Sequence, residues 1–153
     1  MYKRQLYDSS KEKVYLKNEI EYLEKYIEFN KIRTSDTEMS FLVEGNPTNK
    51  VIAPLLLLPF VENAIKYGVT NEKASFIKIV INVEGTDLSF TCENSKSKAI
   101  SQSLKGGIGI PNVKRRLELI YPDNHSLELI DSDEYYKAQL NVCLLYTSPS
   151  PRD

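Results

Sequence analysis

The chain has 153 residues, of which 41% are hydrophobic and 27% charged, and this predicts one globular domain that buries a core without disulfides. Its 20 Lys and Arg residues nearly balance its 21 Asp and Glu residues, so the formal net charge of -1 indicates no general attraction to nucleic acid or anionic lipid. The longest apolar run, residues 51–61, is too short and too interrupted by proline to span a bilayer, and the presence of only 2 cysteines favours a reducing, cytoplasmic setting.

Both ends of the chain are expected to lie outside the natural protein. Residues 1–5 and residues 143–153 resemble translated sequencing adapter in its two orientations, and the second segment is rich in Ser and Pro. We therefore expect residues 6–142 to be the biological chain, and we expect the gene to continue in both directions.

The first predicted element is an amphipathic helix over residues 12–33. Its apolar positions recur three or four residues apart with Lys and Glu between them, and these positions are Leu16, Ile20, Leu23 and Ile27. The stripe fits either a packed helix or a dimer seam. The polar stretch that follows, residues 34–40, has no periodicity and is predicted to be a linker.

A short strand over residues 40–44 and a buried helix over residues 54–67 are predicted next. Gly45 begins the turn that ends the strand. Pro54 fits the first turn of the helix, Pro59 predicts a kink inside it, and Gly68 ends it.

The second half of the chain predicts two hairpins and one more helix. Residues 76–83 and 88–92 alternate in polarity around a turn, and residues 127–130 and 135–142 repeat this pattern. Between the hairpins lie a polar stretch and a helix over residues 110–120. These elements predict an α+β fold, a two-layer sandwich with a mixed, mostly antiparallel sheet and helices on one face.

Two segments carry the polar groups that point to chemistry. In residues 58–68, Glu62, Asn63 and Lys66 interrupt a buried helix, which costs stability unless they meet a polar partner. In residues 106–117, glycines precede a helix, where free backbone N–H groups and the helix dipole favour a phosphate. An asparagine oxygen suits Mg²⁺, and a lysine three residues later lies on the same helical face. Together the segments predict a site for a magnesium-bound triphosphate.

Residues 53–68 and 107–117, in this order and separated by a hairpin and a polar loop, resemble two motifs of a known family. They are similar to the N box and the second glycine box of the LytS/YehU-type sensor histidine kinases, in the GHKL superfamily. Residues 16–27 resemble the helix that precedes the catalytic domain there. The resemblance implies a Bergerat-type ATP-binding fold, with a linking helix and linker from the dimerisation and phosphoacceptor region at 6–39 and the catalytic domain at 40–142.

The resemblance also implies roles for individual residues. Asn63 would hold Mg²⁺, and Lys66 and Tyr67 would approach the phosphates of ATP. Gly107 and Gly109 would form the turn beside the phosphates. Residues 94–105 would form the lid over the nucleotide.

Adenine recognition is implied for residues 91–95, where this sequence departs from the family pattern. Family members commonly have an Asp-Asn-Gly sequence whose aspartate bonds the adenine amino group. Here Glu93 takes the aspartate position and Ser95 the glycine position. The resemblance therefore implies recognition by Glu93 or by its neighbour Asn94.

The implied function is transfer of the ATP γ-phosphate to a histidine outside the chain. The only histidine, His125, follows the second glycine-preceded helix, which is the wrong place for the acceptor. Superfamily hydrolases have a glutamate where Pro59 stands, so ATP hydrolysis is not expected.

The expected partners are an upstream dimerisation and phosphoacceptor domain, a second copy in a homodimer, and a response regulator. The parent protein would be an inner-membrane receptor with this domain on the cytoplasmic side. Two alternatives stay open. One is a non-catalytic nucleotide-binding or partner-switch module, which the altered residues 93–95 favour, and the other is a structural interaction domain.

Overall fold

The computed structural model describes residues 13–33, 36–69, 75–96 and 109–144. Its helices are α2 (Leu16–Arg33), α3 (Leu58–Gly68) and α4 (Gly109–Ile120). The main sheet contains β2 (Thr37–Gly45), β4 (Ser75–Glu84), β5 (Asp87–Ser95), β6 (His125–Asp131) and β7 (Tyr135–Cys143). Two short strands, β1 (Val14–Tyr15) and β3 (Val51–Ile52), form a separate antiparallel pair.

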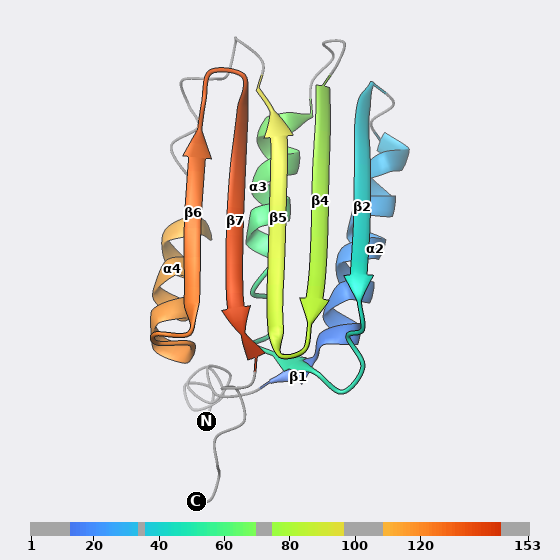
Figure 1. Ribbon diagram of the computed structural model, residues 1–153. Coiled ribbons are helices and arrows are strands. Elements are labelled where there is room, and N and C mark those ends of the chain that lie inside the picture. The colour runs from blue at the N-terminus through green and yellow to red at the C-terminus, as the bar shows by residue number, and fades with distance from the viewer. Residues whose placement is uncertain (1–12, 34–35, 70–74, 97–108, 145–153) are drawn as a thin grey trace, which may run out of the picture.

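The fold is a two-layer α+β sandwich, as predicted. The 5-stranded sheet has the order β2-β4-β5-β7-β6. β2 runs parallel to β4, and every other neighbouring pair in the sheet is antiparallel. The described helices all cover one face, with α2 behind β2, α4 behind β6 and α3 between them (Figure 1). None of the described helices is long and apolar enough to cross a membrane.

One hydrophobic core joins the sheet to the helices. Along β4 and β5 alternate side chains are buried, since successive residues of a strand point to opposite faces. The apolar stripe of α2 is buried in the same core, so it packs within this chain and is not a free seam. The boundary expected at residue 40 falls inside β2, and β7 extends to Cys143, with Leu144 buried beyond it.

The start of α3 differs from the prediction. Residues 54–57 form turns, and the helix begins at Leu58 with Pro59 in its first turn. Pro59 therefore starts the helix and does not kink it, because a first-turn proline has no intrahelical N–H bond to lose. In the preceding turn Leu55 has a φ of 55°, a left-handed conformation that is rare for a leucine.

Cys92 provides a test of this core. Its thiol is buried on β5, lies 3.5 Å from the carbonyl oxygen of Phe60, and has its pKa raised to about 12 by burial. Because thiolate is the reactive form, we expect iodoacetamide to label the half-buried Cys143 in the native protein and Cys92 only after unfolding. Mass spectrometry of the labelled peptides measures this. A Cys143→Ser variant should stay unlabelled when native, and rapid labelling of Cys92 in it would contradict the fold.

Candidate nucleotide site between the helix layer and the sheet

Asn63 lies on the face of α3 that packs on the sheet. Its side chain is only 8% exposed, with Phe60 and Ala64 also buried on the same helix. Within the described residues the enclosed side-chain atom without a hydrogen-bond partner is Oε2 of Glu19, and no atom of the Asn63 amide is of this kind. A carboxamide both donates and accepts hydrogen bonds, so Asn63 can serve as a ligand to a polar group that reaches this face of α3.

The last turn of α3 lies directly on β5. A Cβ atom added to Gly68 would stand 2.7 Å from the Cβ of Asn94, which is closer than packed atoms allow, and 3.2 Å from Cγ1 of Ile77, which is a tight contact. Glycine is therefore required for this approach. It brings α3 against Asn94, which is 1% exposed and donates from Nδ2 to the carbonyl oxygen of Ser95 at 2.8 Å.

The two adenine candidates lie on opposite faces of the sheet. Alternate residues of β5 that lie on the same face as Asn94, among them Phe90 and Cys92, are buried toward the helices. Glu93 points to the other face, where it stands in register between Lys78 of β4 and Lys137 of β7. Since cross-strand neighbours of opposite charge attract, these two lysines can stabilise Glu93 on the helix-free face of the sheet. Only Asn94 shares the face of the sheet on which Asn63 lies.

Gly109 opens α4, which packs against α3. The two helices run in opposite directions, so the first turn of α4 points toward the end of the sheet where α3 and β5 end (Figure 1). α3 carries Asn63 and β5 carries Asn94 on the sides of these elements that face each other. Gly107 and residues 97–105 of the expected lid lie outside the described residues.

Lys66 and Tyr67 occupy the same end of α3. Lys66 is exposed, and its Nζ atom lies 5.4 Å from the centre of the half-buried Tyr67 ring. A cation at this distance is attracted to the ring face. The ammonium group is therefore held near the helix end while it stays in contact with solvent, where it can meet an anionic ligand.

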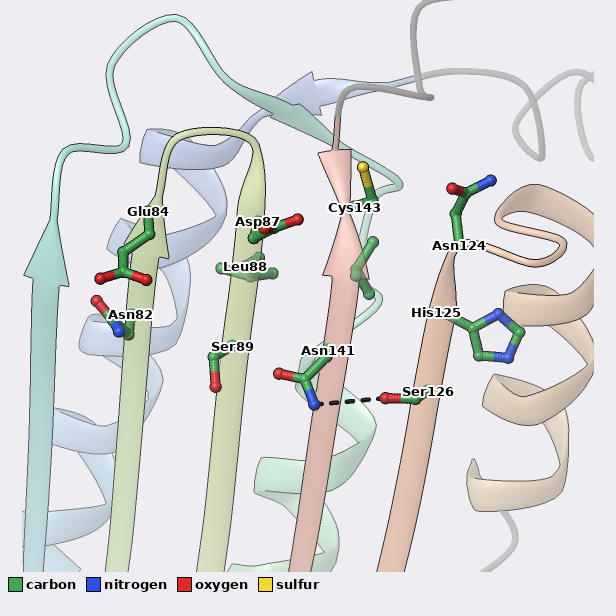
Figure 2. Close-up of a pocket in the computed structure, with 11 residues that line it drawn as sticks. Asn82, Glu84, Asp87, Leu88, Ser89, Asn124, His125, Ser126, Asn141 and Cys143 are labelled. Carbon is green, nitrogen blue, oxygen red and sulfur yellow. Dashed lines mark hydrogen bonds between the residues drawn. The ribbon is translucent and has the colours of Figure 1, made fainter.

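A polar pocket of about 450 Å³ lies elsewhere, around the turn between β4 and β5 (Figure 2). Asp87, at its rim, is seven residues before Asn94 on β5, which at about 3.3 Å per residue separates the two by roughly 23 Å. His125 also lines this pocket, and its Nδ1 atom lies 2.7 Å from the carbonyl oxygen of Tyr121. This histidine is remote from Asn63 and Asn94.

No family model and no curated protein sequence matches this chain. Solved structures do match. The catalytic domain of histidine kinase ThkA superposes with a TM-score of 0.62 at 15% identity, covering 87% of this chain and 97% of that one. Histidine kinase AdeS of Acinetobacter baumannii gives 0.60 at 15% identity, covering 87% and 66%. ThkA in complex with response regulator TrrA gives 0.57 at 12% identity, covering 90% and 43%. The fold is that of histidine kinase ATP-binding domains.

The close approach at Gly68 predicts the sign of a stability change. Replacing a helical glycine with alanine ordinarily stabilises a helix by about 0.5–1 kcal/mol. Here we expect Gly68→Ala to destabilise the protein by about 1–3 kcal/mol, because the methyl group forces α3 away from Asn94. Urea unfolding measures the difference. The exposed Glu62→Ala should change stability little, and a Gly68→Ala variant more stable than the parent would contradict the packing.

Proposed function

We propose that this chain is the ATP-binding catalytic domain of a sensor histidine kinase of the LytS/YehU type. The observation that carries the proposal is the pair of buried amides, Asn63 on α3 and Asn94 on β5, at the sheet end toward which α4 begins. Asn94 donates to the carbonyl oxygen of Ser95, and each carboxamide has further donor and acceptor capacity that a polar ligand can use. The match to histidine kinase catalytic domains supports ATP as that ligand.

Asn63 would supply one oxygen to Mg²⁺, which screens the charge of the ATP phosphates. The described residues contain no group of three or more His, Cys, Asp or Glu side chains that could hold a metal ion. A single protein oxygen is still sufficient, because Mg²⁺ usually keeps several waters and takes its other ligands from substrate phosphates. Lys66 and Tyr67 would contact the phosphates, together with backbone N–H groups at Gly107 and Gly109.

Asn94 is the better adenine ligand of the two candidates. A carboxamide both donates and accepts, so it can bond the adenine amino group and an adjacent ring nitrogen, whereas an ionised carboxylate only accepts. A neutral group also costs less to bury than a carboxylate. Glu93 lies on the opposite face, and we assign it no contact with the nucleotide.

The domain would promote phosphoryl transfer by position and charge. Pro59 stands one helical turn before Asn63, where no side chain can act as a base to activate water, so transfer is favoured over hydrolysis. The acceptor histidine would lie on an upstream dimerisation domain of a homodimer, and the phosphate would pass to a response regulator. The ThkA complex with its response regulator supports this last partner. The intact parent would be an inner-membrane receptor with this domain in the cytoplasm.

The role of Asn63 is tested by titrating ATP with and without Mg²⁺. We expect Mg²⁺ to strengthen ATP binding to the parent chain and to have little effect on Asn63→Ala, whose affinity falls about 10- to 100-fold for the loss of a ligand to a charged group. Isothermal titration calorimetry measures both. Binding that is indifferent to Mg²⁺ and to Asn63 would instead indicate the non-catalytic nucleotide module. Absence of any binding would indicate a structural domain.

The assignment of adenine to one face is tested by a neighbouring pair of variants. Asn94→Ala should weaken ATP binding about 10- to 100-fold, since two hydrogen bonds to the base are lost. Glu93→Ala should leave the dissociation constant for ATP within about twofold, because it removes only the cross-strand attraction to Lys78 and Lys137. GTP, which presents a carbonyl in place of the adenine amino group, should bind weakly to the parent. The reverse order of the two variants would refute the assignment.

A further inference from the structure

The turn that precedes α3, residues 53–57, is held by side chains from α4 and from the residue just after it. Arg116 donates from Nη2 to the carbonyl oxygen of Pro54 at 2.8 Å and from Nη1 to that of Leu55 at 3.3 Å. The hydroxyl of Tyr121, which is fully buried, accepts a hydrogen bond from the backbone N–H of Ala53 at 3.0 Å. The C-terminal half of α4 is thereby attached to the start of α3.

Glu19 of α2 approaches the same turn from the other side. Its side chain is 5% exposed. Burial raises the pKa of Glu19, while hydrogen bonds from the backbone of Leu55 and Leu56 and the charge of Arg116 act to lower it. Within the described residues its Oε2 atom has no hydrogen-bond partner. Among the described residues Glu19 and Arg116 form no salt bridge, and what they share is the turn, whose carbonyl oxygens accept hydrogen bonds from Arg116 and whose backbone N–H groups face Glu19. The charge of Arg116 favours the ionised form of Glu19 through space.

The turn lacks local features that would fix its shape. Leu55 has its φ of 55° without the freedom of glycine, so the conformation persists only because neighbouring groups impose it. α3 has no side-chain cap at its N-terminus, where Leu57 stands at the capping position. The position of the first turn of α3 is therefore determined by Glu19, Arg116 and Tyr121, which come from other elements.

We propose that Arg116 and Glu19 are positioning residues that fix the start of α3 and so couple α2 to the nucleotide site. α3 carries Asn63 only five residues after it begins at Leu58, and a helix of that length moves as a rigid unit. A displacement of α2 moves Glu19, the turn and α3 together. The coupling to nucleotide rests on the function proposed above, whereas the positioning does not.

Hydrogen exchange in the nucleotide-free protein tests the positioning. We expect Arg116→Met to raise the exchange rates of residues 53–60 about tenfold or more, because it leaves the Glu19 carboxylate buried without a countercharge. Arg115→Met, which removes the exposed neighbouring arginine, should leave them unchanged. In a Glu19→Gln background Arg116→Met should have a smaller effect, since no buried charge remains. Equal effects in the two backgrounds, or equal effects of Arg115→Met and Arg116→Met, would overturn the proposal.

ATP affinity tests the coupling. We expect the dissociation constant of the Arg116→Met variant to rise about fivefold or more, with partial recovery when Glu19→Gln is added. Arg116→Lys, which retains the charge and loses the fork of donors, should lie between parent and Arg116→Met. Raised exchange with unchanged ATP affinity would overturn the coupling to the site. If the parent chain binds no ATP, the proposed function fails, and the exchange data still decide the positioning.

Discussion

The contact between Gly68 and Asn94 is the constraint on which the candidate site depends. With no side chain at residue 68, the last turn of α3 rests on β5 at a distance that any Cβ atom would prevent. That approach sets how near the sheet Asn63 lies, about one and a half turns earlier on the same helix. It also covers Asn94, which is 1% exposed. The absence of a side chain at residue 68 thus sets how closely α3 packs on this end of β5.

The buried amides and the carboxylates of this protein have different surroundings. Both buried polar groups of the candidate site, Asn63 and Asn94, are neutral. Burying a neutral amide without a ligand costs the folded protein less free energy than burying an unpaired charge. Glu19 is a buried carboxylate, and the charge of Arg116, which binds the same turn, acts on it. Glu93 is a carboxylate on the helix-free face, in register with a lysine on each side. Each of these two carboxylates therefore has a cationic group among its neighbours, whereas the two buried amides carry no charge.

Local periodicity predicted the hairpins and helices because burial on one face leaves a regular pattern in the sequence. It could not choose between Pro54 and Pro59 as the helix start, since both fit a first turn and the choice depends on contacts from Arg116 and Tyr121 to the turn between them. Alternation along β5 from Phe90 indicates the face of Asn94, whereas comparison by residue type favours Glu93, so the sequence left both as adenine candidates. Arg116 is adjacent to Arg115, and nothing local distinguishes the half-buried arginine from the exposed one.

The one-sided arrangement of the layers explains why a distant helix can affect the site. α2 covers one edge of the sheet and α4 the other, with α3 between them (Figure 1). The turn before α3 is the place where polar side chains from both outer helices meet, Glu19 from α2 and Arg116 from α4. In the coupling proposed above, a change at either outer helix would reach α3 through this turn, beside the direct contacts of α2 with β2 and of α4 with α3 and β6. A site that takes Asn63 from α3 and backbone donors from the start of α4 would, on this proposal, respond to the position of α2, even though α2 would contribute none of its ligands.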